Sequence, residues 1–102
     1  MVLNTLERLL LLSVLPKEGD YTTLKIVREL RESLSFTEAE HAVLNFVTRE
    51  DGNLAWNVGE ADEVEVNIGG KARGIVAELL RKLDAEKKMT VQHITLFEKF
   101  LD

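Results

Sequence analysis

The stretch VEVNIGGKARGIVAELL, residues 64–80, sets an alternating segment directly before a helical one. Apolar and polar side chains alternate over residues 64–68, which predicts a strand with one solvated face. Two glycines end this strand, and the apolar spacing after them predicts a helix over residues 71–88. Strand, glycine turn and helix are also the parts of a phosphate-binding turn, so the spacing of the glycines decides which fold is present.

That spacing fits neither common phosphate-binding turn. A Walker-type loop carries a hydroxyl residue directly after its lysine, and here Ala72 follows Lys71. The dinucleotide fingerprint fails because Lys71 occupies the place of its second glycine. Both motifs also need a second parallel strand after the helix, whereas only another helix is predicted there. The glycines therefore serve as a turn, with Gly74 expected to allow close packing, and the pattern leaves open whether the turn 69–71 binds an anion.

Three helices are predicted upstream of this stretch. Asn4 and Glu7 form a capping box for a first helix that Pro16 ends. An apolar stripe over residues 24–34 predicts the second helix, and a second capping box at residues 37–40 opens a short third one. The residues of the third helix that we expect to face the core are Ala39, Ala42, Val43 and Phe46.

A hairpin is predicted between the third helix and the strand. Asp51-Gly52 is a strong signal for a two-residue turn, and alternating segments flank it on both sides. With that turn, Val47 would share one face with Leu54 and Trp56 and contribute to the core.

The chain ends in a predicted fifth helix capped by Thr90. Its expected inward residues are Val91, Ile94, Phe97 and Leu101. The whole order is three helices, a hairpin with a third strand, and two helices. It predicts one compact α+β domain over residues 1–102 with a small antiparallel sheet, either the β-hairpin alone or a three-stranded sheet.

The composition excludes several kinds of binding site and catalytic site. The chain is 45% hydrophobic and 30% charged with a net charge of −5, which is typical of a soluble globular protein and disfavours general affinity for nucleic acid. Absence of cysteine excludes disulfides, thiolate nucleophiles and cysteine-bound zinc. Glu38 and His41 share a helical face, but one such pair is too few for a carboxylate-bridged metal site. We therefore expect no enzyme activity, no cofactor and no metal.

The first helix carries more leucine than one apolar stripe needs, because residues 9–12 cover every side of a turn. Either this helix lies centrally in the core, or one face meets another chain. We expect a homodimer and a further protein partner, bound through the first and last helices. The predicted interface residues are Leu6, Leu9, Leu10, Leu12, Phe97, Phe100 and Leu101. The run is too short to cross a bilayer and is interrupted by Glu7 and Arg8, so we expect a cytoplasmic protein.

Three helices followed by a hairpin is also the order of a winged helix, which makes a nucleic-acid-binding regulator the alternative. Its contact residues would be Lys25, Arg28, Arg31, Lys71 and Arg73. Acidic residues at the start of the third helix and at the hairpin tip oppose this alternative, because they would repel phosphates. Lys25 and Arg28 each precede a glutamate by four residues, which predicts ion pairs on a solvated face.

Two segments, LNTLERLLLLSVLPKEGDYTTLKIVRELRESLSFTEAEH at 3–41 and LLRKLDAEKKMTVQHITLFEKFL at 79–101, resemble small uncharacterised proteins of phage genomes and environmental sequence collections. The resemblance brings no assigned activity and no functional residues. It implies a viral or mobile-element context, in which a small acidic protein acts by binding a host or virion protein. We therefore expect a non-enzymatic protein-interaction or assembly module.

Overall fold

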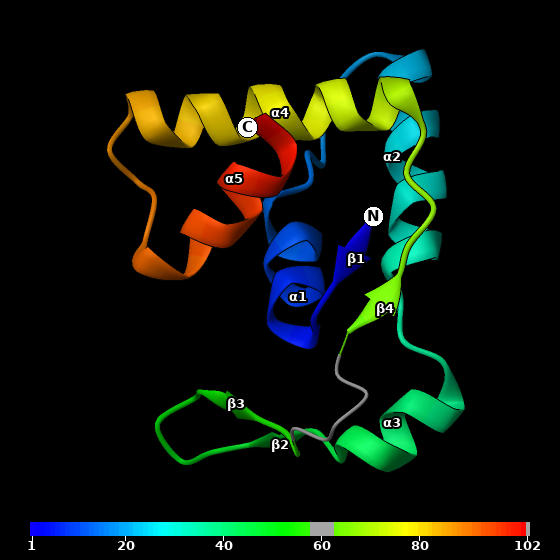
Figure 1. Ribbon diagram of the computed structural model, residues 1–102, viewed down its shortest axis with the longest axis vertical. Helices are drawn as coiled ribbons and strands as arrows, with labels where there is room; N and C mark the ends of the chain where they lie inside the picture. The colour runs from blue at the N-terminus through cyan, green and yellow to red at the C-terminus, as the bar shows by residue number, and fades with distance from the viewer. Residues whose placement is uncertain (58–62, 102) are drawn as a thin grey trace.

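A computed structural model describes residues 1–57 and 63–101 and shows an α+β fold (Figure 1). The elements in chain order are β1 (Val2–Leu3), α1 (Thr5–Val14), α2 (Tyr21–Leu34), α3 (Glu38–Leu44), β2 (Val47–Thr48), β3 (Leu54–Ala55), β4 (Val64–Glu65), α4 (Gly70–Ala85), the 3₁₀ turn η1 (Val91–His93) and α5 (Ile94–Leu101). None of the helices in the described part of the chain is both long and apolar enough to cross a membrane.

Four helices form the body of the molecule. In Figure 1, α4 runs across the top, with α5 and α1 below it and α2 along one side. Their inward side chains share one hydrophobic core with the β1 and β4 segments. Its fully buried members include Leu3, Leu11, Leu34, Leu80 and Leu96. Burial of these leucines is the main stabilising term of the body, at roughly 1.5–3 kcal/mol each.

Both predicted capping boxes of the N-terminal half are confirmed. The Asn4 side chain accepts from the Glu7 backbone N–H, and the Glu7 carboxylate accepts from the Asn4 backbone N–H. Thr37 and Glu40 exchange the same pair of bonds at the start of α3. The last helix begins differently from the prediction, because Thr90 caps η1 before α5 continues the chain.

Short antiparallel strands and the hairpin are present as predicted, but a single three-stranded sheet, one of the two predicted arrangements, is not formed. The structure has two separate two-stranded antiparallel sheets, β1 with β4 and β2 with β3. Val2 pairs with Glu65 and Leu3 with Val64, so the strand that follows the hairpin joins the start of the chain. A segment of two residues before α1 is too short to show the alternation by which strands are recognised in a sequence.

The hairpin is present, but its predicted register is shifted by one residue. Thr48 pairs with Leu54 and Val47 with Ala55. The Gly52 backbone N–H donates to the Arg49 carbonyl, and Gly52 has a φ of 85°, so the turn is a three-residue loop with a glycine bulge. In this register Val47 lies beside Ala55 on one face of the hairpin and Leu54 lies beside Thr48 on the other face, and both Val47 and Leu54 are exposed instead of in the core.

Several predicted inward residues lie outward. On α3, Val43 is 68% exposed and Leu44 is buried in its place, whereas on the last helix Val91 and Ile94 are exposed and Leu96 is buried. The predicted close packing at Gly74 is also absent, because a Cβ there would meet no atom of the described residues within 4 Å apart from its chain neighbours and the backbone of its own helix.

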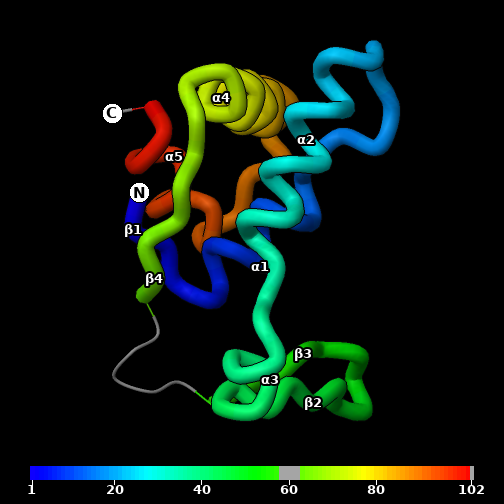
Figure 2. Tube along the Cα trace, turned by 90° about the vertical axis from the view of Figure 1, so that its right-hand side faces the viewer, coloured from blue at the N-terminus to red at the C-terminus, as the bar shows by residue number. Residues whose placement is uncertain are grey.

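Residues 36–57, which comprise α3 and the β2–β3 hairpin, project from the body as a separate unit that we call the lobe (Figure 2). The chain exposes 7019 Å² of surface. A compact monomer of 11.6 kDa is expected to expose about 5,800 Å², an excess of about 1,200 Å². The radius of gyration, 14.1 Å, also exceeds the value of about 12.8 Å for a compact chain of this length.

Candidate protein-interaction site

The residues predicted as a self-association surface lie half-buried against the body. On α1 these are Leu6, Leu9, Leu10 and Leu12, and on α5 they are Phe97, Phe100 and Leu101. All except Leu6 and Leu9 pack against the hydrophobic core. Ile94, at the start of α5, is 47% exposed, whereas the other large apolar side chains that the structure leaves exposed lie on neither α1 nor α5. Most of the exposed apolar side chains therefore lie away from the predicted interface residues.

The inward face of α1 carries charged residues as well as leucine. Glu7 and Arg8 are 1% and 3% exposed, although the sequence suggested only that they interrupt an apolar run. They lie beside Leu11, which is fully buried. Buried charges require partners because their desolvation is costly. The partners of Glu7 and Arg8 lie on other elements, so these two side chains connect α1 to the lobe and to α5.

Arg8 joins the body to the lobe. Its Nε donates to the Leu34 carbonyl at 3.1 Å, and its Nη2 donates to the Ser35 carbonyl at 2.8 Å. The guanidinium also forms an ion pair with Glu40 on α3, and its Cζ lies 4.0 Å from the centre of the Phe36 ring. Two backbone carbonyls, a carboxylate and a ring thus hold one buried side chain. These contacts set the position of α3 relative to α1 and α2.

Glu7 joins the two ends of the body. Lys99 of α5 donates to Glu7 Oε1 at 2.7 Å and to the Val2 carbonyl at 2.9 Å. Burial acts to raise the pKa of Glu7, but the bonds from Lys99 and from the Asn4 backbone outweigh it and hold the pKa below its ordinary value. The carboxylate therefore stays ionised and ties α5 to β1 and α1.

An aromatic cluster links α3 to the hairpin within the lobe. The ring centroids of Phe36 and Phe46 are 5.2 Å apart, and His41 lies 5.5 Å from Phe46 in an edge-to-face arrangement. Trp56, directly after β3, has its ring centroid 6.0 Å from that of Phe46. Such pairs contribute about 0.5–1.5 kcal/mol each beyond the area that they bury. The three rings of Phe36, Phe46 and Trp56 are half-buried, so the lobe has internal packing of its own.

Three branched apolar side chains of the lobe are exposed. Val43 of α3 is 68% exposed, Val47 of β2 is 51% exposed and Leu54 of β3 is 42% exposed. Val47 and Leu54 lie on opposite faces of the hairpin, because Val47 pairs with Ala55 and Leu54 pairs with Thr48. Three exposed branched side chains on a unit of this size form a candidate protein-interaction site. The sequence pattern does not reveal this site, because the faces of the two strands depend on the hairpin register.

The cations predicted for nucleic-acid binding lie on two helices. Lys25, Arg28 and Arg31 are exposed on α2, and Lys71 and Arg73 are exposed on α4. The five do not form one continuous basic face, because Glu29 and Glu32 are exposed among the α2 cations. The predicted pairs of Lys25 with Glu29 and Arg28 with Glu32 are not formed.

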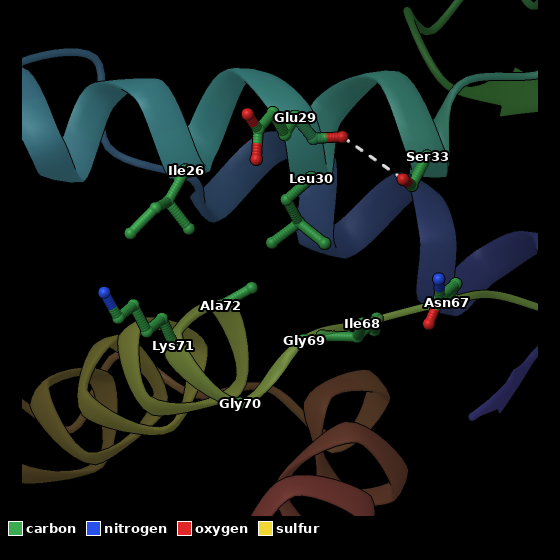
Figure 3. Close-up of a pocket in the computed structure, with 10 residues that line it drawn as sticks. All are labelled: Ile26, Glu29, Leu30, Ser33, Asn67, Ile68, Gly69, Gly70, Lys71 and Ala72. Carbon is green, nitrogen blue, oxygen red and sulfur yellow. Dashed lines mark hydrogen bonds between the residues drawn. The ribbon is translucent and has the colours of Figure 1, made fainter.

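A groove of about 420 Å³ lies between α2 and the turn that begins α4 (Figure 3). Ile26, Leu30 and Ala72 give it apolar walls, and Glu29 and Lys71 are the charged residues that line it. The volume is within the usual range of ligand pockets. Its polar side chains are all exposed to solvent, however, so the groove has no buried polar group to orient a ligand.

The side chains considered for metal or catalytic chemistry lie on α3 and in the turn before α5. No group of three or more metal-ligating side chains is found among those residues. Glu38 and His41 are both exposed on α3. The only other histidine, His93, is 9% exposed and its Nδ1 lies 2.9 Å from the Thr90 hydroxyl, so it serves a cap.

No protein-family model, curated protein or solved structure matches the chain.

Proposed function

We propose that this chain is a small, non-enzymatic protein-interaction module of the cytoplasm and that the lobe is its binding surface. The observation that carries the proposal is the exposure of Val43, Val47 and Leu54 on a unit that projects from the body. Exposed apolar side chains that are gathered on one unit are typical of surfaces that bind another protein.

Two further features support binding by the lobe. The aromatic cluster of Phe36, His41, Phe46 and Trp56 gives the lobe internal packing, so the lobe does not need to fold on binding. Arg8 holds the lobe at a defined position through Leu34, Ser35 and Glu40. A surface that is already ordered loses less conformational entropy on association than a flexible one.

Affinity capture with immobilised protein tests the proposal. Val47→Asp and Leu54→Asp place a charge on the lobe surface, and Val91→Asp is the matched control because Val91 is 83% exposed but lies on η1. Captured proteins are identified by mass spectrometry, purified, and titrated against each variant. We expect both lobe variants to weaken binding at least tenfold, whereas Val91→Asp leaves the dissociation constant unchanged.

The variants must keep the fold for this comparison to count, and their far-ultraviolet circular dichroism should equal that of the wild type. Exposed positions usually tolerate such changes within about 0.5 kcal/mol. A partner that binds the lobe variants as tightly as the wild type would assign the interaction to another surface and refute the role of the lobe.

The winged-helix alternative makes a different prediction. If Lys25, Arg28 and Arg31 contact phosphates, affinity for a DNA or RNA duplex falls steeply between about 50 and 200 mM salt. Absence of binding at the lower salt concentration would exclude this alternative. The exposed Glu29 and Glu32 on the same helix lead us to favour the protein-interaction module.

A further inference from the structure

We infer that the outer face of α2 is a self-association surface, on which a second copy of this chain binds through an antiparallel pairing of the two α2 helices. The outer face is the side opposite Val27, Leu30 and Leu34, which are buried. Its exposed residues are Tyr21, Lys25, Arg28, Glu29 and Glu32. This surface is separate from the lobe, so the inference does not depend on the proposed function.

The charges of this face have no partner within the described part of the chain. Lys25, Arg28, Glu29 and Glu32 form no ion pair with any residue in ranges 1–57 and 63–101. Tyr21, at the start of the same face, is 80% exposed. Two cations and two anions of one helix face are therefore available to another molecule.

The order of these charges is self-complementary. Two antiparallel copies whose two-fold axis passes between Arg28 and Glu29 place Lys25 of each copy opposite Glu32 of the other. The same register places Arg28 opposite Glu29. If one helix is shifted along the other by three residues in either direction, only one of Lys25 and Arg28 lies opposite a glutamate. In the register centred at 28–29, all four charged residues of each copy thus lie opposite a residue of the other sign. The two-fold symmetry forms each of the two contacts twice.

Charge complementarity of this kind selects a second copy over a nucleic acid, because the two glutamates that would repel phosphates are here the required partners. Helix α2 has 14 residues and is about 21 Å long. A pair of such faces buries less than a standard interface, so we expect a dissociation constant on the order of micromolar.

Charge reversal at two positions tests this pairing. Lys25→Glu and Glu32→Lys each replace two attractive contacts in the dimer by two repulsive ones. Sedimentation equilibrium from about 5 μM to 1 mM protein at low salt should show a concentration-dependent dimer for the wild type. We expect each single variant to raise the dissociation constant about tenfold or more.

An equimolar mixture of the two single variants gives the sharper result. In the heterodimer, the reversed acidic charge of the Lys25→Glu chain faces the reversed basic charge of the Glu32→Lys chain. The second contact of that heterodimer is the unchanged pair of Lys25 with Glu32. The mixture should therefore regain the affinity of the wild type, which no change within one chain can explain. Lys17→Glu, at an exposed residue before α2, is the control and should leave the dimer unchanged.

A wild-type chain that stays monomeric over the whole concentration range would overturn the inference. A mixture that associates no better than the single variants would overturn it as well. The lobe variants Val47→Asp and Leu54→Asp should keep the wild-type dimer, so a failure of the proposed lobe surface and a failure of this pairing are distinguishable.

Discussion

Arg8 is one residue that holds two parts of the molecule together. Arg8→Met keeps the apolar stem but removes the donors to Leu34, Ser35 and Glu40. We expect a loss of about 3 kcal/mol in the free energy of unfolding, since buried acceptors lose charge-assisted hydrogen bonds. Urea unfolding followed by circular dichroism and by the fluorescence of Trp56 measures this loss in the body and in the lobe.

Arg49→Met, on the exposed hairpin, is the matched control for Arg8. Its side chain forms no ion pair with the residues that the structure describes, and the change should stay within about 0.5 kcal/mol. If Arg8→Met is equally neutral by both probes, the buried guanidinium does not set the position of the lobe.

Glu7 makes the stability of the body depend on pH. Burial acts against ionisation, but Lys99 and the Asn4 backbone hold the pKa of Glu7 below its ordinary value near 4.5. A depressed pKa stabilises the fold above the unfolded pKa, and this stability is lost as pH falls through the folded pKa. We expect the free energy of unfolding to fall from about pH 4.5 downward, and to fall less steeply in Glu7→Gln.

The comparison for Glu7 is Glu98→Gln, which changes an exposed carboxylate on the same helix as Lys99. Its pH profile should follow that of the wild type. The Arg8 side chain also lowers the pKa of Glu40, so part of the acid dependence persists in Glu7→Gln. Identical profiles for Glu7→Gln and the wild type would show that the Glu7–Lys99 bond does not control acid stability.

The sequence alone could not show that Glu7 and Arg8 are buried. In a helix pattern, Glu7 and Arg8 interrupt a leucine run, and nothing local shows that Lys99 and Glu40 lie beside them. Their burial depends on contacts between residues more than 30 positions apart in the chain. Periodicity describes one element at a time, so it could not place Glu7 and Arg8 on the inward face of α1.

At the scale of elements, two glycines should respond to alanine in opposite directions. Gly52 has a φ of 85°, a conformation that costs an alanine about 1 kcal/mol or more. Gly74 lies inside α4 with open space around it, so alanine there should stabilise the helix by about 0.5–1 kcal/mol. The fluorescence midpoint of Trp56 should fall in Gly52→Ala, and the circular dichroism midpoint should rise in Gly74→Ala.

Each glycine variant is the control for the other, because each should move mainly the probe of its own element. If Gly74→Ala is less stable than the wild type, the result would contradict the open space at that position. It would instead support the close packing that the sequence suggested.

Local signals predicted the elements well where the cause is local. The capping boxes at Asn4 and Thr37 begin their helices as expected, and Asp51-Gly52 makes a turn between two strands. The dipeptide does not determine the loop length, however, and one extra loop residue separates Val47 and Leu54 onto opposite faces of the hairpin. The candidate site was missed for this reason, whereas the α+β class was predicted correctly from the element order.

At the scale of the whole molecule, a projecting lobe should be measurable in solution. The 14.1 Å radius of gyration and the 7019 Å² of surface both exceed what a compact chain of this size requires. Small-angle X-ray scattering of the chain, diluted until its mass is that of one copy, should give a radius of gyration above about 13 Å. Its pair-distance distribution should have a shoulder at long distances.

Glu40→Gln connects this shape to the joint at Arg8. The substitution removes the charge that Arg8 pairs with but leaves the aromatic cluster of the lobe in place. We expect the helix content to stay constant while the radius of gyration rises, because a lobe with a weaker attachment samples positions farther from the body. A wild-type radius near the compact value would mean that the lobe folds back onto the body. Its exposed valines and leucine would then be core residues, and the search for a partner would move to the outer face of α2.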